Sequence, residues 1–442
     1  MEGLKKNISK FFFRLISLIS RAKFFEKMEI IKEYEFIDRE KIEEFQFSEL
    51  KGLLETAYKE VPFYRKKFKA RNITPNSLKK LSDLEKFPIV SKSEIRHQYK
   101  EMINRRNSID TLKKTQSSGS TGEPKVFYYD KGAYGWRLAS QFYGWQRAGF
   151  EFGEKWLRIS MAERNTLFYK IFNFFSRCIY IGLTEFGEEK YEEVKRVLER
   201  KKPTVIYSYA SALYLISEYL DRQECNYTFV KSIIVQGDIC FPEYRDKIEK
   251  VFNTKVFDTY GGDGVIISGQ CVEGNHHVLD LGVIVEIVDD NFNIVPEGKI
   301  GKVLITDLHN TVMPLIRYEI GDLGAKTSIN CKCGSNFSTI MSPIGRDTDV
   351  INLSNGVSLF VHYFTFLFEY YSEILQFQVR EIGKDELLIN LKVTDKFSDK
   401  LGQEIEKKIL DYCKGGVKVD IEIVEDIPLE RSNKRRLVIG KN

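Results

Sequence analysis

The feature that most constrains this chain is a short run of glycines and hydroxyl residues that ends in Pro-Lys. Residues 117–125 read Ser-Ser-Gly-Ser-Thr-Gly-Glu-Pro-Lys. Gly119 and Gly122 let the backbone adopt positive φ and approach a ligand closely, so consecutive N–H groups can point at one anion. Lys125 adds a positive charge, and further donors come from the hydroxyls of Ser117, Ser118, Ser120 and Thr121. The run therefore predicts a loop that binds a polyphosphate. A flexible surface turn is the alternative, and the run lacks the Gly-Lys-Ser/Thr end of a Walker loop.

The 442-residue chain is too long for one hydrophobic core, so two or three domains are expected. Strand-like and helix-like segments alternate from about 115 to 345, which indicates an α/β fold. Strands are predicted at 202–209, 232–236, 283–288, 302–306, 375–379, 386–393 and 417–424, and helices at 28–70 with a break at Pro62, 191–201, 242–252 and 399–412. The predicted architecture is an N-terminal α/β domain at 1–345, with a helical start at 1–110 and a β-rich part at about 265–345, followed by a small α+β domain at 346–442.

The composition excludes several classes of protein. Lys and Arg outnumber Asp and Glu by only 68 to 63, and a net charge of +5 is too small to indicate a nucleic acid as the main partner. The seven cysteines are an odd number spread along the chain, unlike a secreted disulfide framework. The sequence shows no secretory cleavage signal and no apolar run near the ~20 residues of a spanning helix. We therefore expect a cytoplasmic protein.

The N-terminal segment is amphipathic. Its apolar residues, which fall largely on one helical face, are Phe11, Phe12, Leu15, Ile16, Leu18, Ile19 and Phe25. Its basic residues are Lys5, Lys6, Lys10, Arg14, Arg21 and Lys23. The favoured interpretation is a first helix that packs against the body of the protein. The alternative is peripheral contact with a membrane interface.

Residues 117–125 resemble, at every position, the ATP-phosphate loop of the adenylate-forming superfamily, which contains acyl-CoA synthetases, luciferases and peptide-synthetase adenylation domains. Further matches follow in the family's order over nearly the whole chain. Tyr260-Gly261-Gly262-Asp263-Gly264 is similar to the family's aromatic-Gly-x-Thr-Glu segment. The resemblance implies that Tyr260 contacts adenine, with Gly261 and Gly262 beside it, and that Mg²⁺ binds here with ATP. Gly264 replaces the family's metal-binding Glu, so Asp263 is a candidate for the missing carboxylate. Otherwise the triphosphate itself holds Mg²⁺.

Three later segments are also similar to functional segments of this family. Tyr318–Asp322 resembles the segment whose aspartate binds the ribose hydroxyls, which implies this role for Asp322. Residues 345–349 resemble the hinge before a small, mobile C-terminal lid domain, with Arg346 near the ribose, although Thr348 stands at the usual hinge Asp. Residues 431–436 resemble the loop of the catalytic lysine. The resemblance implies that Lys434 reaches the carboxylate and the α-phosphate, with Asn433 in place of Gly.

The segments at 53–65 and 82–92 are similar to the phenylacetate–CoA ligase and capsule-biosynthesis (CapK-like) branch. Gln236-Gly237-Asp238 takes the place of that branch's Gly-Glu turn near the acyl pocket, which makes Asp238 a candidate site residue. The branch often carries zinc, and four N/S ligands would complete a tetrahedral structural Zn²⁺ site. The candidate ligands are Cys271, His277, Cys331 and Cys333, and ordinary buried or free thiols are the alternative. Aromatic candidates for the acyl pocket are Trp136, Tyr143, Trp145 and Tyr209.

The resemblance implies a reaction and its partners. A small carboxylic acid is activated by ATP as acyl-AMP with release of pyrophosphate, and the acyl group is then transferred to CoA. One alternative is direct acyl or aminoacyl transfer to an amine, for example on a sugar nucleotide in surface-polysaccharide assembly. A second alternative is a non-catalytic adenylate-binding module. The oligomeric state is left open between monomer and homodimer.

Overall fold

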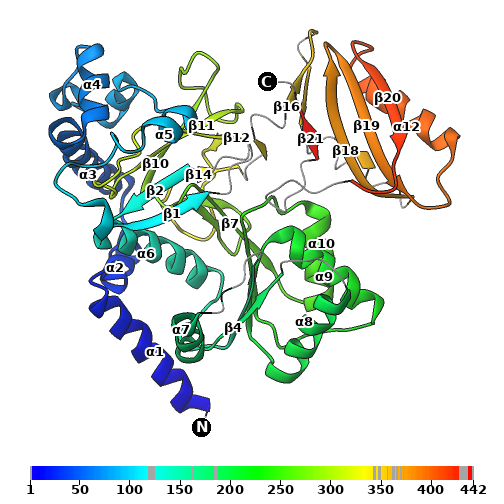
Figure 1. The fold of residues 1–442 in the computed structure, drawn as a ribbon, viewed down its shortest axis with the longest axis horizontal. Helices are drawn as coiled ribbons and strands as arrows, with labels where there is room; N and C mark the ends of the chain where they lie inside the picture. The colour runs from blue at the N-terminus through cyan, green and yellow to red at the C-terminus, as the bar shows by residue number, and fades with distance from the viewer. Residues whose placement is uncertain are drawn as a thin grey trace. The chain divides into compact units, whose positions relative to one another are not determined.

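The computed structural model divides into two compact units (Figure 1). The first contains residues 1–117, 124–320 and 325–342, and the second contains residues 118–123, 321–324 and 343–442. The structure describes residues 2–117, 125–160, 164, 166–183, 188–341, 345–346, 350–355, 357–360, 364, 367–368, 371, 373–427 and 437–440. Within these ranges, no helix is long and apolar enough to cross a bilayer.

Helices open the first unit, and proline and capping signals in the sequence set their ends. They are α1 Glu2–Ile19, α2 Phe24–Tyr34, α3 Arg39–Glu60, α4 Pro62–Ala70 and α5 Lys92–Gln98. The chain passes from α3 to α4 at Pro62, because proline has no N–H for a helix interior but fits a first turn. Ser91 and Glu94 form a capping box, each side chain accepting a hydrogen bond from the other's backbone N–H. The predicted break at Pro62 is confirmed, and the predicted helical segment has a further break, at residues 35–38, that was not predicted.

A nine-stranded sheet forms the centre of the first unit, in the order β13-β14-β9-β8-β7-β6-β5-β3-β4. Its strands are β3 Trp156–Ser160, β4 Cys178–Gly182, β5 Val205–Ser208, β6 Ser232–Gln236, β7 Val256–Gly262, β8 Val265–Gln270, β9 His276–Val278, β13 Lys326–Thr327 and β14 Thr339–Ile340. Strands β3 to β7 run parallel, whereas β8, β9 and β14 pair antiparallel. The strands predicted at 202–209 and 232–236 are confirmed as β5 and β6.

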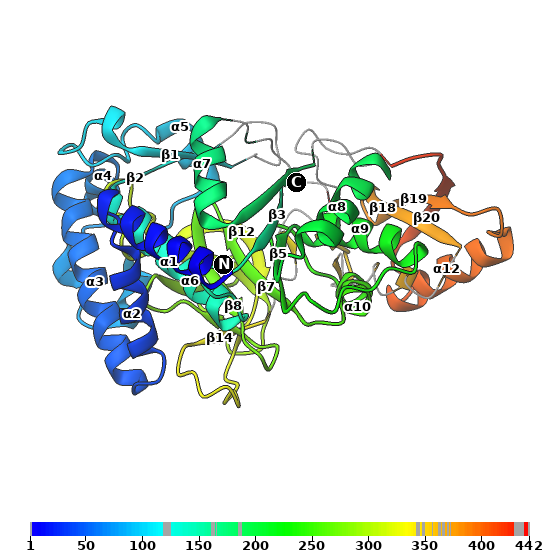
Figure 2. The same ribbon diagram turned by 90° about the horizontal axis from the view of Figure 1, so that it is seen from below.

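Helices cover both faces of this sheet (Figures 1 and 2). Helices α8 Glu188–Lys201, α9 Ala210–Arg222 and α10 Pro242–Phe252 share a core with Ile206 and Ile233. On the other face, α2 and α6 Lys131–Arg147 share a core with Val205 and Ile234. Successive residues of a strand point to opposite faces, so the apolar runs of β5 and β6 are buried on both sides. Helix α7 Leu167–Ser176 lies in the connection between β3 and β4.

A second sheet, from the β-rich part, and a separate hairpin accompany the nine-stranded sheet. Strands β10 Val283–Val288, β11 Gly301–Asp307, β12 Tyr318–Gly324 and β15 Gly345–Arg346 form a sheet in that order. Strands β1 Lys113–Ser117 and β2 Lys125–Tyr129 form an antiparallel hairpin. The buried Arg317 pairs with Glu286 of β10 at 3.0 Å and donates to the carbonyls of Glu85 and Phe87 at 2.7 and 2.9 Å. This arginine therefore ties the N-terminal segment to the sheet. The predicted strands at 283–288 and 302–306 are confirmed.

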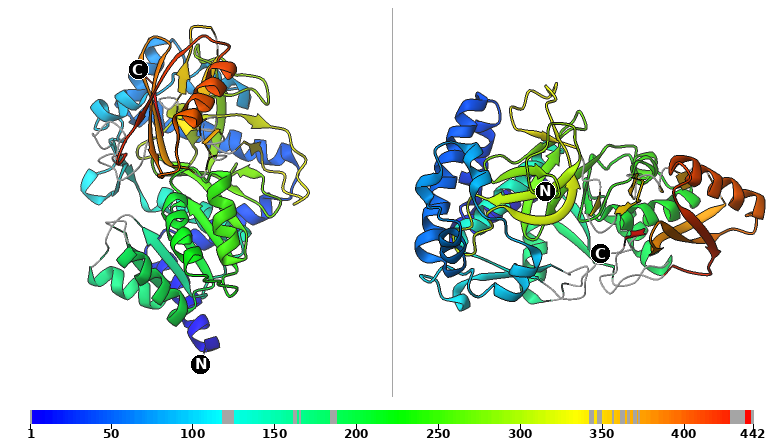
Figure 3. Two further views of the ribbon diagram at one scale, coloured as in Figure 1. Left: turned by 90° about the vertical axis from the view of Figure 1, so that its right-hand side faces the viewer. Right: turned by 90° about the horizontal axis from the view of Figure 1, so that it is seen from above.

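The second unit contains a two-stranded and a four-stranded sheet. Strands β16 Val350–Asn352 and β17 Ser358–Phe360 pair, and β18 Ile374–Gly383, β19 Glu386–Val393, β20 Lys418–Ile423 and β21 Val438–Ile439 form a sheet in the order β20-β19-β18-β21. Helix α12 Asp399–Tyr412 buries Ile405 and Ile409 and packs against this sheet (Figure 3). The predicted α+β character of the C-terminal region is confirmed.

Candidate functional site

The carboxyl ends of three neighbouring parallel strands bring several predicted site residues to one edge of the large sheet. Tyr209 follows β5, Gly237 and Asp238 follow β6, and β7 ends at Tyr260–Gly262. In register, Ser208 lies opposite Val235, and Gln236 lies opposite Thr259. Ligands of α/β sheets bind outside the carboxyl ends of the strands, where loops diverge. This edge is therefore the candidate site.

The predicted phosphate loop connects the two strands of the β1–β2 hairpin. The backbone of Ser117 pairs with that of Lys125, so the ends of the loop are held opposite each other. Residues 118–124 lie outside the described residues, and they include the predicted ligands Ser118, Gly119, Ser120, Thr121 and Gly122. The structure thus fixes the two stems of the loop.

Lys125 belongs to a buried polar cluster with Asp263 and Tyr318. Its ammonium donates to the Asp263 carboxylate and to the Tyr318 hydroxyl, the latter at 2.9 Å. The Tyr318 hydroxyl in turn donates to Asp263 Oδ2 at 2.6 Å. The side chains of Lys125 and Asp263 are each 7% exposed. Burial lowers the pKa of Lys125, and the neighbouring Asp263 opposes that shift.

Gly264, where the family has its metal-binding Glu, adopts a conformation that excludes a side chain. Its φ is +85°, and an added Cβ would lie 1.9 Å from the hydroxyl oxygen of Tyr129 and 3.3 Å from a Thr115 methyl. The Tyr129 hydroxyl donates to the backbone carbonyl of Asp263 at 3.2 Å. The local fold therefore requires a glycine at this position and excludes the family's Glu. The adjacent Asp263 supplies the only carboxylate of the Tyr260–Gly264 segment.

Tyr260 and the two glycines after it lie in a tight β7–β8 hairpin. Tyr260 is buried, and the register between the strands shifts between Tyr260 and Gly261. A Cβ on Gly261 would lie 2.5 Å from the carbonyl oxygen of Val265, and one on Gly262 would lie 3.1 Å from an Ile320 methyl. Close backbone approach therefore explains Gly261, whereas Gly262 is limited by the Ile320 side chain. The adenine role of this segment stays a prediction.

Asp238 caps the neighbouring helix α9. Its carboxylate accepts hydrogen bonds from the backbone N–H groups of Ala210 and Ser211, at 2.8 and 3.1 Å, and from the Ser211 hydroxyl. A carboxylate at a helix N-terminus accepts hydrogen bonds from N–H groups that have no partner within the helix, and its negative charge interacts favourably with the helix dipole. Gly237 has φ +98°, and a Cβ there would lie 2.6 Å from the Tyr209 ring. The turn after β6 is thereby fixed against α9, and a ligand role for Asp238 stays a prediction.

The two residues predicted at the ribose are cross-strand partners. Asp322 of β12 pairs in register with Arg346 of β15, and Asp322 is half-buried. Their roles at the ribose stay a prediction. The predicted catalytic Lys434 and Thr348 of the predicted hinge lie outside the described residues.

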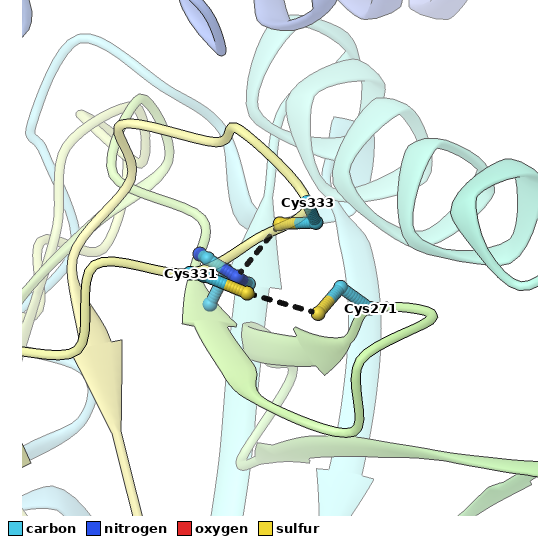
Figure 4. Close-up of side chains that lie close together, drawn as sticks. Cys271, Cys331 and Cys333 are labelled. Atoms are coloured by element: carbon cyan, nitrogen blue, oxygen red, sulfur yellow. Dashed lines mark hydrogen bonds between the residues drawn. The ribbon is translucent and has the colours of Figure 1, made fainter.

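The predicted zinc ligands converge at one point of the first unit. Cys271 follows β8, His277 lies in β9, and Cys331 and Cys333 lie in the connection between β13 and β14 (Figure 4). Their four ligand atoms all lie within 4.8 Å of one another. His277 Nδ1 donates to the Phe337 carbonyl at 3.2 Å, so Nε2 faces the Cys333 thiol at 3.3 Å with its lone pair free for a metal.

The surroundings favour the ligand forms of two of these residues, His277 and Cys331. Burial and the nearby Arg147 lower the pKa of His277 to about 4, which keeps the imidazole neutral. Burial opposes ionisation of Cys331, but hydrogen bonds from the Cys333 backbone and the Asn275 amide lower its pKa. Arg147 also donates to the Cys333 sulfur at 3.1 Å. Burial raises the pKa of the Cys271 thiol to about 11. A neutral imidazole and three sulfur ligands fit Zn²⁺ in a closed tetrahedral site.

Sequence reasoning missed some site residues and overvalued others. Tyr318 was not predicted to touch the Lys125 cluster, although it begins the same segment as Asp322. Tyr129 occupies the space that a side chain at position 264 would need. It ends strand β2, which begins at the phosphate loop, and no local sequence pattern predicts this contact. Of the aromatic candidates for the acyl pocket, Tyr143 and Trp145 are instead buried core residues on α6. Aromatic side chains on helices serve packing more often than binding.

Comparison with known proteins gives the same family as the motifs. The chain is 26% identical over 391 residues to phenylacetate-coenzyme A ligase of Thermus thermophilus, covering 84% of this chain and 86% of that protein. It is 20% identical over 453 residues to protein CapK of Staphylococcus aureus, covering 98% of each. It has a TM-score of 0.76 and 19% identity to 2-hydroxyisobutyryl-CoA ligase in complex with 2-HIB-AMP, covering 92% of this chain and 91% of that chain. No family model matches the sequence. The chain is thus similar over most of its length to phenylacetate–CoA ligases and to CapK, it shares the fold of an acyl-CoA ligase, and the order of its motifs agrees with the adenylate-forming superfamily.

Proposed function

We propose that this protein uses ATP to activate a small carboxylic acid as an acyl-adenylate and then transfers the acyl group to CoA. The observation that carries the proposal is the buried pairing of Lys125 with Asp263 at the stem of the phosphate loop. A desolvated ammonium beside that loop suits an anionic phosphate, and a paired aspartate suits a divalent cation that accompanies it. The relatives named above support the same reaction class.

The reaction has two displacements. A carboxylate oxygen attacks the α-phosphorus of ATP, and pyrophosphate leaves with the bridging oxygen. The CoA sulfur then attacks the acyl carbonyl carbon, and AMP leaves. Negative charge builds on the phosphates in the first step, so cations positioned in advance lower its barrier. Closure of a lid domain would exclude water from the adenylate.

Each predicted residue has a role in this scheme. Lys125 binds the phosphates and, in doing so, gives up its pairing with Asp263, whose carboxylate then helps to hold Mg²⁺. Tyr260 borders the adenine, and Asp322 and Arg346 bind the ribose. Lys434 bridges the acid and the α-phosphate. These assignments rest on the family resemblance and, for Lys125 and Asp263, on their contacts.

Zinc has a structural place in the proposal. Cys271, His277, Cys331 and Cys333 would bind one Zn²⁺ and join the end of β8, strand β9 and the β13–β14 connection. Four protein ligands leave no open position for a substrate, so the ion holds the β-rich part together. A site with three thiolates fits the reducing cytoplasm, which is the compartment we propose.

An amine is the second candidate acceptor, and the absence of the Glu at Gly264 is the feature that favours a specialised branch. Product analysis separates the two acceptors. If CoA is the acceptor, a thioester appears only when CoA is present. An amide formed without CoA would replace this part of the proposal.

The direct test is acid-dependent exchange of labelled pyrophosphate into ATP, using a panel that begins with phenylacetate and 2-hydroxyisobutyrate. We expect at least one small acid to support exchange and Lys434→Ala to abolish it. The matched control is Lys407→Ala, an exposed lysine on α12 of the same unit. If no acid supports exchange and Lys434→Ala behaves like wild type, the protein is a non-catalytic adenylate-binding module instead.

A further inference from the structure

Exposed apolar side chains are concentrated on two neighbouring helices of the first unit. Among the described residues, more than half of the large hydrophobic side chains that are exposed lie on α1 and α7. These helices contain only 18 and 10 residues. Apolar surface gathered in one place marks an interaction site more reliably than scattered exposed residues do.

Helix α1 turns its apolar stripe away from the protein. Leu4, Ile8, Phe11, Leu15 and Leu18 recur at spacings of four and three residues, so they share one face, and they are 38–66% exposed. The opposite face carries Ser9, Phe13 and Ser17, which are 0%, 2% and 3% exposed. A helix that belongs only to a protein core buries its apolar stripe and exposes its polar one. Helix α1 does the reverse.

Close contacts fix α1 in this orientation. A Cβ on Gly153 would lie 2.5 Å from the Lys6 carbonyl oxygen, so the helix backbone rests directly on that glycine. The Lys6 ammonium pairs with Glu151 at 2.9 Å. After the helix, a Cβ on Gly135 would lie 1.8 Å from the Ala22 carbonyl oxygen. Rotating the helix to bury its stripe would bring large side chains to the positions that Ser9 and Ser17 now hold.

Helix α7 extends the apolar surface. Leu167, Phe168, Ile171 and Phe174 are 48–77% exposed, whereas Ser176 is its only buried residue. The helix contacts α1 through Phe12, whose ring stacks on Phe175 with a centroid distance of 5.1 Å. Two helices that are far apart in the sequence therefore form one surface, here named the α1–α7 face: the exposed apolar side chains of both helices.

The charges around this face are basic. Lys5, Lys10, Arg14 and Lys170 are exposed on the two helices. The one acidic residue within α1 and α7 is Glu2, and its carboxylate pairs with Arg177. Aromatic and aliphatic side chains flanked by Lys and Arg complement an acyl-chain boundary beneath anionic headgroups.

We propose that the α1–α7 face docks the protein onto an anionic lipid bilayer surface. Both helices lie in the plane of the interface, with their apolar side chains among the upper acyl chains and their basic side chains at the headgroups. The proposal is independent of the chemistry assigned above, because none of these residues belongs to the candidate site.

Vesicle flotation of the full chain tests the proposal, with vesicles of phosphatidylcholine alone or mixed with phosphatidylglycerol. We expect the wild type to float with the mixed vesicles and to bind at least about tenfold more weakly to phosphatidylcholine alone. Leu15→Gln with Phe174→Gln should reduce binding to mixed vesicles at least about tenfold, because two inserted side chains are lost. Lys10→Gln with Arg14→Gln should weaken binding to mixed vesicles at low salt, and this difference from wild type should disappear at high salt.

The matched control is Ile294→Gln, at an isoleucine that is 49% exposed and outside the α1–α7 face. It should bind vesicles like wild type, and all variants should keep the wild-type melting temperature and pyrophosphate exchange. If wild type does not float with anionic vesicles, or if Leu15→Gln with Phe174→Gln floats as well as wild type, the proposal is overturned. A wild-type dimer that these substitutions convert to a monomer, without vesicle binding, would assign the face to a second copy and also overturn it.

Discussion

The first unit contains two buried polar clusters that balance their charge in different ways. The Lys125–Asp263–Tyr318 cluster holds one ammonium, one carboxylate and a hydroxyl, and it is neutral as it stands. The cluster of Cys271, His277, Cys331 and Cys333 gathers three thiols and an imidazole, with Arg147 and Asn275 as outer donors. The first cluster contains its own counter-ion, whereas the second consists of atoms that can serve as metal ligands.

This difference fits the two proposed roles, a phosphate site that exchanges partners and a metal site that keeps its ion. A paired ammonium can leave its aspartate for a phosphate, because the anion replaces the lost charge. Ionised thiols within a few ångströms of one another repel, so a bound cation would stabilise the second cluster in its ionised form. We expect substitutions in the two clusters to show this contrast.

The largest effect is expected at the thiol cluster. Cys331→Ser with Cys333→Ser should remove the metal and lower the free energy of unfolding by about 4 kcal/mol or more, because metal binding is coupled to folding. Metal analysis of the purified protein and urea unfolding measure both changes. Cys225→Ser, at a half-buried cysteine outside the cluster, should keep the metal and the stability. Wild type that contains no zinc after growth with ample metal would contradict the structural role.

The next effect is expected at Lys125. Lys125→Met leaves the buried Asp263 carboxylate without its cation and should lower the free energy of unfolding by about 3 kcal/mol. Pyrophosphate exchange should fall about 100-fold, since a positioned charge on the phosphates is lost.

The companion variant is Lys125→Met with Asp263→Asn, which removes both charges together. It should regain most of the stability but none of the exchange activity, which separates folding from function. Equal recovery of activity would show that the pair serves the fold alone.

A smaller effect is expected at Gly264. Gly264→Ala should lower the free energy of unfolding by about 3 kcal/mol, because the new methyl meets the Tyr129 hydroxyl and the backbone is left-handed. In a Tyr129→Phe background the added loss should shrink to about 2 kcal/mol, because the hydroxyl is gone while the ring carbon 2.9 Å from the new methyl and the left-handed backbone remain. Gly298→Ala is the matched control, since Gly298 has φ +74° and open space around it. Thermal and urea unfolding of wild type, Gly264→Ala, Tyr129→Phe, the double variant and Gly298→Ala test this. If Gly264→Ala lowers the free energy of unfolding equally in both backgrounds, the Tyr129 hydroxyl does not exclude a side chain at Gly264.

The smallest effect is expected at Asp238. Asp238→Ala removes the acceptor for two backbone N–H groups of α9 and should lower the free energy of unfolding by about 1 kcal/mol. Asp238→Asn keeps one oxygen acceptor and should lower the free energy of unfolding by less than Asp238→Ala does. If exchange falls far more than the stability loss explains, Asp238 also contacts the substrate, and kinetics of both variants at fixed temperature decide this.

Much of the fold could be predicted because its signals are local. The break at Pro62, the capping box at Ser91 and the buried run of Ser232–Gln236 each depend on residues close together in the chain. The order of the motifs placed the nucleotide residues, and the structure brings the four metal candidates together. The roles of Tyr129 and Tyr318 were not predictable, because each depends on a contact across the fold.

The sequence predicted a phosphate loop between Ser117 and Lys125, indicated the family and supplied the residue types for a metal site. The pairing of Lys125 with Asp263, 138 residues away, and the contact with Tyr318, 193 residues away, became visible in the folded structure. The tertiary structure also decided that α1 faces outward with its apolar stripe. The physical reason is that a motif or a helical period is a property of neighbouring residues, whereas charge pairing, steric exclusion and the buried side of a helix are set by packing between distant segments.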